Sequence, residues 1–151
     1  MMNNYFEFEQ DFVESLRCIP MIVRYKLDTC GVKLKLSHWH QFNHLIRQEI
    51  VDKPCSTPEE IKDYREWLNE LVIQHTDTPA KELSIELNPG WMDDTKIPDI
   101  VQNKAQETGV EIKLEQWKNL TPLQRFVLIK LSRPSHENKN FLPAIKEFQL
   151  I

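Results

Sequence analysis

Residues 19–51 read IPMIVRYKLDTCGVKLKLSHWHQFNHLIRQEIV, and residues 97–129 read IPDIVQNKAQETGVEIKLEQWKNLTPLQRFVLI. The second segment aligns with the first without a gap, 78 positions further along the chain. Twelve of the 33 aligned positions are identical, whereas average residue usage predicts roughly two by chance. The sequence therefore predicts an internal duplication, which decides the fold. The identical pairs are Ile19/Ile97, Pro20/Pro98, Ile22/Ile100, Val23/Val101, Lys26/Lys104, Gly31/Gly109, Val32/Val110, Lys35/Lys113, Leu36/Leu114, Trp39/Trp117, Leu45/Leu123 and Arg47/Arg125.

The first half of each repeat has the start and end signals of a helix. Pro20 and Pro98 suit the first turn, where the missing N–H has no partner to lose. Gly31 and Gly109 follow about three turns later, where a helix often ends in the left-handed conformation. Each repeat is therefore predicted to begin with a helix of about ten residues.

The second half of each repeat changes period. Residues 32–36 and 110–114 alternate apolar and polar side chains, which indicates a short extended piece. A short turn that carries Trp39 or Trp117 follows, and Thr121-Pro122 then has the pattern of a helix start. Each repeat is predicted as helix, extended piece, Trp turn and helix. We expect the two to pack about a pseudo-two-fold axis, where the extended pieces would pair as a two-stranded antiparallel ribbon.

The segments outside the repeat complete a mainly α fold with one domain over residues 1–151. Thr57-Pro58-Glu59-Glu60 has the pattern of a capping box, and apolar residues at helical spacing follow it, so a helix is predicted over 58–75. Residues 76–96 are predicted as an ordered connector, and 143–148 as the last helix. Four apolar residues of the connector are expected to need burial: Leu83, Ile85, Leu87 and Trp91.

Composition restricts the classes of function. The net charge of −4 and the pI near 5.7 argue against a nucleic-acid-binding module, which is usually basic. The chain has no run that resembles a signal peptide or a membrane span, and its three cysteines are expected to be reduced. Its three glycines are too scattered for a phosphate-binding loop. These features predict a cytoplasmic protein without a bound nucleotide, a membrane partner or a nucleic-acid partner.

The sequence contains few residues whose type and spacing suit metal binding or catalysis. His38 and His40, together with Cys30 and Cys55, have the residue types of a zinc site. In a helix, however, residues two apart point in different directions, and the repeat counterparts are not metal ligands, so no metal or other cofactor is expected. Trp39 and Trp117 are expected in the core, flanked by more exposed histidines. The equivalent Arg47 and Arg125 are expected to cap carbonyls or to pair with a carboxylate. No catalytic residue is predicted.

The segment 133–141 is the strongest candidate for a binding site. It follows the most apolar predicted helix, and a polar loop held by a rigid core is where binding residues tend to lie. The alternative is an ordinary solvated turn in which two asparagines cap the last helix. Phe141 is expected either to anchor an interface or to hold the loop on the core. The predicted partner-binding residues are Arg133, His136, Glu137, Asn138, Lys139, Asn140 and Phe141.

Several of these strings resemble the nitrate-reductase-associated proteins found mainly in cyanobacteria. The resemblance covers essentially the whole chain and is weakest over 37–53. The strings that carry it are Phe6-Glu-Phe-Glu-Gln-Asp-Phe12, Leu16-Arg-Cys-Ile-Pro-Met21, Val23-Arg-Tyr-Lys-Leu-Asp-Thr-Cys-Gly31, Leu120-Thr-Pro-Leu-Gln-Arg-Phe126, Leu128-Ile-Lys-Leu-Ser-Arg-Pro134 and His136-Glu-Asn-Lys-Asn-Phe-Leu-Pro-Ala144.

The resemblance implies a non-catalytic helper of assimilatory nitrate reductase, a molybdenum and iron–sulfur enzyme. Such a helper would bind that enzyme in the cytoplasm and act on its assembly, stability or activity. It implies no catalytic residues. The alternative is a carrier or enzyme that handles a molybdenum-cofactor or iron–sulfur intermediate, which requires a basic pocket or iron-binding thiols.

Overall fold

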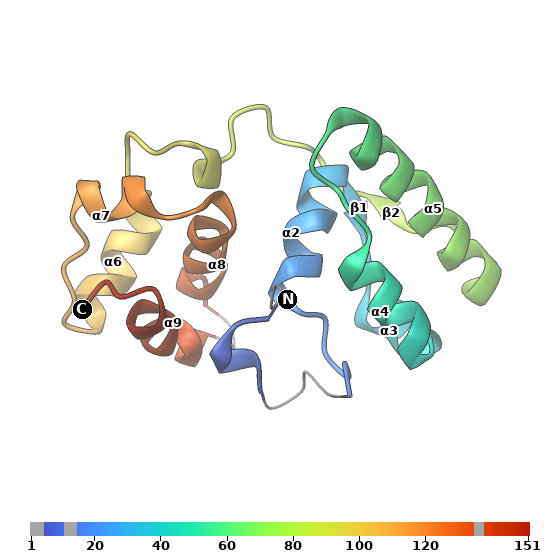
Figure 1. The fold of residues 1–151 in the computed structure, drawn as a ribbon, viewed down its shortest axis with the longest axis horizontal. Helices are drawn as coiled ribbons and strands as arrows, with labels where there is room; N and C mark the ends of the chain where they lie inside the picture. The colour runs from blue at the N-terminus through green and yellow to red at the C-terminus, as the bar shows by residue number, and fades with distance from the viewer. Residues whose placement is uncertain (1–4, 11–14, 135–137) are drawn as a thin grey trace. The chain divides into compact units, whose positions relative to one another are not determined.

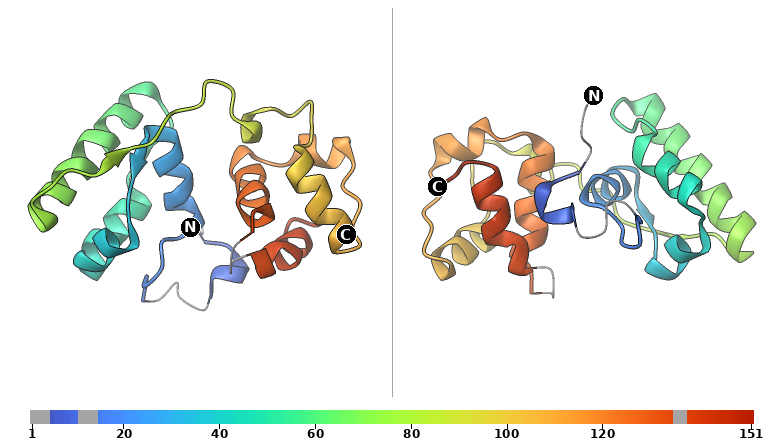
Figure 2. Two further views of the ribbon diagram at one scale, coloured as in Figure 1. Left: turned by 180° about the vertical axis from the view of Figure 1, so that it is seen from behind. Right: turned by 60° about the horizontal axis from the view of Figure 1, so that its bottom comes forward.

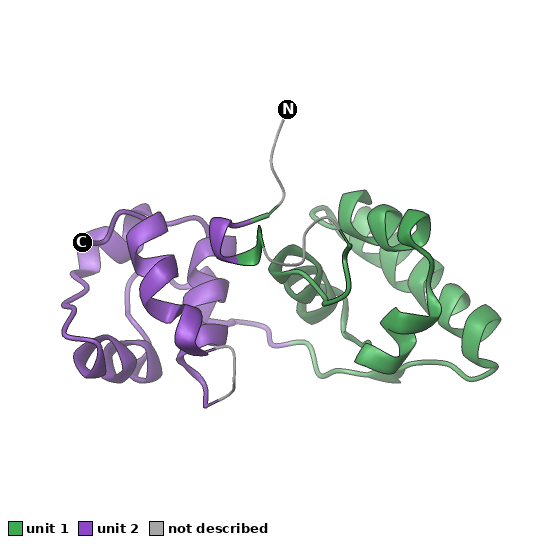
Figure 3. Cartoon of the chain, turned by 90° about the horizontal axis from the view of Figure 1, so that it is seen from below, with its two compact units in different colours: residues 1–5, 9–85 green, residues 6–8, 86–151 purple. Residues whose placement is uncertain are grey.

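The computed structural model describes residues 5–10, 15–134 and 138–151, and it is mainly helical, as predicted. The chain divides into two compact units, which we describe separately (Figure 3). Unit 1 comprises residues 1–5 and 9–85, and unit 2 comprises residues 6–8 and 86–151. The prediction of one domain over 1–151, with its pseudo-two-fold axis, stays a prediction. None of the helices in the described residues is long and apolar enough to cross a membrane.

Unit 1 is a group of helices around a core that includes Trp39, Tyr64 and Leu68. The helix α5 packs on α2 and α3, and α4 packs on α2 (Figure 1). The elements are α2 (Met21–Cys30), β1 (Val32–Lys33), α3 (Leu36–Gln41), α4 (His44–Asp52), α5 (Pro58–Thr76) and β2 (Lys81–Glu82), preceded by the 3-10 turn η1 (Glu7–Glu9), which spans the boundary between the units.

The predicted helix over 58–75 is confirmed as α5. Thr57 accepts a hydrogen bond from the backbone N–H of Glu60 at 3.2 Å, and the Glu60 carboxylate accepts one from the N–H of Thr57 at 3.0 Å. This capping box satisfies groups that the first turn leaves without a partner. The helix ends at Thr76, and the C-cap residue Asp77 takes the left-handed conformation with φ 65°. Its buried side chains, Tyr64, Leu68 and Val72, lie at helical spacing and hold α5 on the core.

A short ribbon is present, but the predicted pairing was wrong. β1 pairs antiparallel with β2, with Val32 opposite Glu82, and the backbone N–H of Leu83 extends the contact to the carbonyl of Gly31 at 2.8 Å. The partner is therefore the connector after α5, not residues 110–114, which contain no strand in the part of the chain described. An alternating pattern indicates an extended conformation but does not identify its partner, and the chain leaving α5 reaches β1 first.

Unit 2 is built around α8, whose side chains are buried on nearly every side. α8 contacts η2, α6, η3 and α9 (Figures 1 and 2). Its first turn has a capping box formed by Thr121 and Gln124. The last helix begins at Phe141, two residues before the predicted start. The elements are η2 (Gly90–Met92), α6 (Asp99–Glu107), α7 (Leu114–Asn119), α8 (Pro122–Ser132), η3 (Asn138–Asn140) and α9 (Phe141–Glu147).

The segments 19–51 and 97–129 contain corresponding elements in the same order. Each has a helix that follows a proline, a glycine with φ 77°, a short non-helical piece, a six-residue helix that carries the tryptophan, and a longer helix. β1 has no strand counterpart in the second segment, where residues 110–113 belong to no helix or strand. The duplication itself stays a prediction, and superposition of the two backbones is the measurement that decides it.

The connector is less buried than the sequence predicted. Leu83 and Trp91 are half-buried, but Ile85 is 50% exposed and Leu87 is 95% exposed. Ile85 still packs over Gly31, where it occupies the space that a Cβ would need. Leu87 lies just past the boundary between the two units. The expectation that Ile85 and Leu87 need burial was therefore wrong.

Candidate functional site

The two repeat tryptophans are fully buried, as predicted. Trp39 and Trp117 have no exposed surface. The indole N–H of Trp39 donates to the carbonyl of Leu16 at 2.6 Å, and that of Trp117 donates to the carbonyl of Asp93 at 2.9 Å. Because each indole is enclosed and its one donor is satisfied, both are core residues and offer no ring face to a ligand.

The equivalent arginines cap backbone carbonyls, which is one of the two predicted roles. Nε of Arg47 donates to the carbonyl of Trp39 at 3.1 Å, and Nε of Arg125 donates to that of Trp117 at 3.2 Å. Arg125 also donates to the carbonyls of Trp91 and Leu120, both at 2.8 Å. The planar guanidinium thus joins three segments of unit 2 and is occupied in holding them.

The candidate metal ligands have other partners. Nδ1 of His38 accepts a hydrogen bond from the backbone N–H of Lys35 at 3.1 Å, which closes the capping box of α3. Burial, followed by the charge of Lys35, lowers the pKa of His38. The exposed ring of His40 lies 3.3 Å from the carbonyl of Arg17 through Nε2. Across the described ranges, no three His, Cys, Asp or Glu side chains are grouped to hold a metal ion.

The predicted binding segment 133–141 divides into parts with different surroundings. Arg133 and Lys139 are exposed, Asn138 and Asn140 are half-buried, and Phe141 has no exposed surface. Phe141 therefore holds the segment on the core and is not an interface anchor. Asn140 stands at the N-cap position of α9 but makes no side-chain capping bond. His136 and Glu137, which were also predicted to bind the partner, lie outside the described residues.

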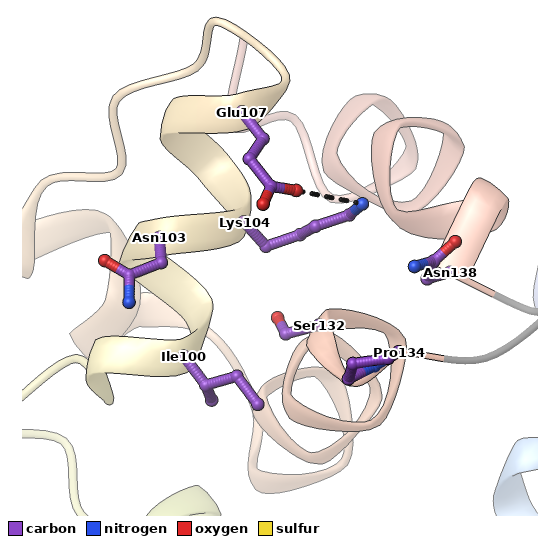
Figure 4. Close-up of a pocket in the computed structure, with 7 residues that line it drawn as sticks. All are labelled: Ile100, Asn103, Lys104, Glu107, Ser132, Pro134 and Asn138. Carbon is purple, nitrogen blue, oxygen red and sulfur yellow. Dashed lines mark hydrogen bonds and ion pairs between the residues drawn. The ribbon is translucent and has the colours of Figure 1, made fainter.

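A hollow of about 330 Å³ lies beside this segment, within unit 2 (Figure 4). One wall is a face of α6, and the other is formed by the end of α8 and the residues that follow it. In Figure 4 the side chain of Lys104 extends into the hollow, while Ile100 points toward Pro134. The lining residues are Ile100, Asn103, Lys104, Glu107, Ser132, Pro134 and Asn138.

The hollow presents hydrogen-bonding groups beside a small apolar surface. Nζ of Lys104 pairs with the Glu107 carboxylate at 3.4 Å, and the Ser132 hydroxyl donates to the carbonyl of Leu128 at 2.6 Å. The Lys104 side chain is only 17% exposed, whereas that of Glu107 is 69% exposed. Because the Glu107 end of this pair is open to solvent, the pair contributes only modestly to stability. Amide, ammonium and carboxylate groups thus lie around the apolar side chain of Ile100.

Two of the lining residues, Pro134 and Asn138, belong to the predicted segment 133–141, and Asn138 is one of the predicted binding residues. The four residues from α6 were not predicted, and the binding role of the segment stays a prediction. Ile100, Asn103, Lys104 and Glu107 occur at i, i+3, i+4 and i+7, the spacing of one helix face. That spacing shows that the four share a face. It does not show which segment lies opposite them, so only the fold could join them to residues 132–138.

A second hollow, of about 290 Å³, lies in unit 1 and is lined by Glu49, Asp52, Lys53 and Trp67. Its cationic group is already engaged, because Nζ of Lys53 lies 3.1 Å from the Asp63 carboxylate and 5.1 Å from the centre of the Trp67 ring. Lys104 of the unit 2 hollow is also paired, so position decides between the two: the hollow in unit 2 is the stronger candidate because it adjoins the segment that the sequence selected.

Comparison with known protein families gives a match over nearly the whole chain. No curated protein and no solved structure matches the sequence. A family model described as conserved nitrate reductase-associated protein matches residues 5–148, which cover most of both units and every residue given above as lining the hollow in unit 2. Since this match spans nearly the whole chain, the protein belongs to the family of conserved nitrate reductase-associated proteins.

Proposed function

We propose that this chain is a non-catalytic accessory protein that binds nitrate reductase and supports its assembly, stability or activity. The family description names an association with that enzyme. The proposed contact surface is the hollow between α6 and the end of α8, together with the adjoining exposed residues Arg133 and Lys139. The observation that carries this choice is that Pro134 and Asn138, from the predicted binding segment, line the hollow.

The structure of this wall favours binding to a partner with little rearrangement. α8 is held by buried side chains, and Phe141 fixes the other end of the segment. A surface held at both ends loses less conformational entropy on binding than an unanchored loop. The hollow contains both donors and acceptors, so it can recognise the polar groups and backbone of a protein segment.

A carrier or enzyme for a molybdenum-cofactor or iron–sulfur intermediate is the alternative. It would need a cluster of cationic groups for phosphates or exposed thiols for iron. In the hollow, Lys104 is paired with Glu107, and the thiols of Cys30 and Cys55 are buried. The proposal therefore expects the purified protein to contain no stoichiometric iron, zinc or pterin by elemental analysis and absorbance. About one equivalent of any of these would favour the carrier.

The binding surface can be tested with two matched double variants. Asn103→Ala/Lys139→Ala removes one amide and one ammonium from the proposed surface, and Asn119→Ala/Lys118→Ala removes the same groups from α7. All four residues are exposed, so each variant should retain its Tm within a few degrees. The first variant should bind purified nitrate reductase roughly tenfold more weakly than the unmodified protein, and the second should bind equally well.

Two results would count against the proposal. Equal binding by both variants would show that the surface is elsewhere. If the unmodified protein neither binds nitrate reductase nor changes its yield or activity in cells, the accessory function itself is wrong. Binding should be followed in purified components as well as in extracts of nitrate-grown cells, so that an indirect association is recognised.

A further inference from the structure

Two buried thiols lie together in unit 1, and the proposed function uses neither. Cys30 is the last residue of α2 and has no exposed surface. Cys55 lies between α4 and α5 and is 4% exposed. The third thiol, that of Cys18, is half-buried in the segment before α2. Exposure alone would therefore make Cys18 the most readily oxidised of the three.

Hydrogen bonds hold the two buried sulfur atoms as neighbours. Sγ of Cys30 donates to the carbonyl of Leu27 at 3.8 Å, and Sγ of Cys55 donates to the carbonyl of Lys26 at 3.9 Å. These acceptors belong to consecutive residues of α2. Each thiol is also the largest cause of the shift in the pKa of the other. The fold thus brings the thiols of two residues 25 positions apart to neighbouring carbonyls on one turn of α2.

The surroundings of the pair make its two sulfur atoms unequal. The side chain of Cys55 lowers the pKa of the Cys30 thiol, while the side chain of Cys30 and burial raise the pKa of the Cys55 thiol. Nζ of Lys26 lies near Cys55 and is held by the carbonyls of Val51 and Lys53 at 2.5 and 2.7 Å. Cys30 is therefore the thiol that ionises first.

We propose that Cys30 and Cys55 are a redox-modification site that forms a reversible intramolecular disulfide when the protein meets a peroxide. The proposal rests on two buried thiols that the fold brings to consecutive carbonyls of α2. It is independent of the nitrate reductase surface, because unit 1 contains both cysteines and the hollow lies in unit 2.

The chemistry balances with hydrogen peroxide as the oxidant. The Cys30 thiolate attacks one peroxide oxygen, the O–O bond breaks, and hydroxide leaves as a sulfenic acid forms. The Cys55 sulfur then attacks that sulfur, the S–S bond forms, and water leaves. Two thiols and one hydrogen peroxide become one disulfide and two waters. A small-molecule dithiol reverses the change by exchange.

The disulfide would link the end of α2 to the segment that leads into α5. It would close a loop over residues 30–55, which contains α3 and α4. Closing such a loop restricts the unfolded chain, so the oxidised protein should unfold at a higher temperature, by roughly 5–10 °C. Oxidation would therefore change the stability of unit 1 with little change in its fold.

The test treats the full reduced chain with hydrogen peroxide at low molar excess, followed by intact mass measurement and peptide mapping without reduction. The expected product has lost two hydrogen atoms and yields a peptide that joins Cys30 to Cys55, which dithiothreitol separates. Cys18→Ala should form the same product. Cys30→Ala and Cys55→Ala should not form it and should accumulate oxygen adducts instead.

Three outcomes would overturn the proposal. The first is oxidation mainly at Cys18, with both buried thiols unchanged. The second is conversion of Cys30 or Cys55 to sulfinic or sulfonic acid without the link. The third is a linked protein with a lower Tm than the reduced one, because the bond would then have formed from a distorted chain. All three are read on the unmodified protein, so they do not depend on whether the alanine variants fold.

Discussion

Arg47 and Arg125 each donate a hydrogen bond from Nε to the carbonyl of a buried tryptophan, Trp39 and Trp117 respectively. The exposure of the two arginines differs. Arg125 is 7% exposed, whereas Arg47 is half-buried. A hydrogen bond from a charged donor contributes about 1.5–3 kcal/mol, and a buried carbonyl left without a donor adds a penalty. Arg125→Ala should therefore lower the free energy of unfolding of unit 2 by about 2–4 kcal/mol. Arg47→Ala should lower the free energy of unfolding of unit 1 by about half that amount.

Hydrogen exchange of helix amides measures each unit separately, which makes the comparison possible. Protection should fall in α6, α7 and α8 for the Arg125 variant and in α2, α3 and α4 for the Arg47 variant. Arg125→Lys is the control for charge, because lysine keeps the positive charge but cannot reach three carbonyls at once. Full protection in the Lys variant would contradict the argument from geometry.

The capping-box residue Glu60 should make the stability of the folded protein depend on pH, in a direction that follows from its pKa. Hydrogen bonds from the backbone N–H groups of Thr57 and Ser56 lower the pKa of its carboxyl group below the ordinary value of 4.5. A carboxyl whose pKa is lower in the folded protein stabilises it above the unfolded pKa, and this contribution is lost as the pH falls through the folded pKa. The difference in stability between the unmodified protein and Glu60→Gln should thus be largest near neutral pH.

Denaturation by urea at a series of pH values from neutral to below 4 would measure this difference. The difference in free energy of unfolding between the two proteins should become smaller as the pH falls. Glu59→Gln is the matched control, because Glu59 is the exposed neighbour on the same helical turn but does not close the capping box. A pH dependence that is the same for both variants would show that general charge, not the capping box, is responsible.

The burial of a single residue could be predicted where its residue type and its position in the repeat were informative. Two tryptophans at equivalent repeat positions indicate that each packs in a core, and both are buried. Phe141 was assigned two alternative roles, since an aromatic side chain after a polar loop suits either the core or an interface. The wall of the hollow formed by α6 was not predictable, because Lys104 and Glu107 look like any solvated ion pair until the segment opposite them is known.

The helix ends at Gly31 and Gly109 show how one element depends on its surroundings. Both glycines have φ 77°, which is costly for a residue with a Cβ. A Cβ at Gly31 would lie 2.8 Å from Cγ1 of Ile85 and 3.0 Å from the carbonyl oxygen of Leu83, whereas a Cβ at Gly109 meets nothing within 4 Å. Gly109→Ala should lower the free energy of unfolding by about 1 kcal/mol, from backbone strain alone. Gly31→Ala should lower it by about 2–4 kcal/mol, because the clash with Ile85 and Leu83 adds to the strain.

Thermal unfolding followed by circular dichroism would measure both glycine variants. At about 2–4 °C for each kcal/mol in a chain of this size, Gly31→Ala should lower the Tm clearly more than Gly109→Ala. Gly31→Ala combined with Ile85→Ala removes the clashing side chain and should recover part of the loss. Equal effects of the two single variants would show that backbone strain alone decides the cost.

Elements with their own boundary signals were predicted well, and those that depend on distant partners were not. α5 follows from its capping box and its apolar face, and its observed end is one residue beyond the predicted one. β1 contains two residues, too few for the pattern to specify a partner, and its hydrogen bonds come from the connector that returns after α5. The sequence indicated that a ribbon forms but not which segments form it.

At the scale of the whole molecule, the main feature is the division into two compact units. Each contains one copy of the predicted repeat, and the division falls between residues 85 and 86. Proline and glycine signals predicted a connector here, and its apolar residues were expected to pack it against the core. That expectation assumed that every apolar residue of a connector needs burial. Leu87 shows the limit of that assumption, since single exposed apolar side chains are common on protein surfaces.

The same segment should be the first site of proteolysis. Residues 84–88 are exposed and belong to no helix or strand, so a protease can bind them in the extended form that cleavage requires. Thermolysin, which cuts before large apolar residues, should cleave first at Leu87 and produce two fragments, resolved by mass spectrometry. Leu45 is a built-in control, because it is 77% exposed but lies within α4, where backbone hydrogen bonds resist cleavage. Leu87→Gln should slow the first cut markedly without changing the Tm, whereas a first cut at Leu45, or within α6 or α8, would show that the connector is better protected than its exposure indicates.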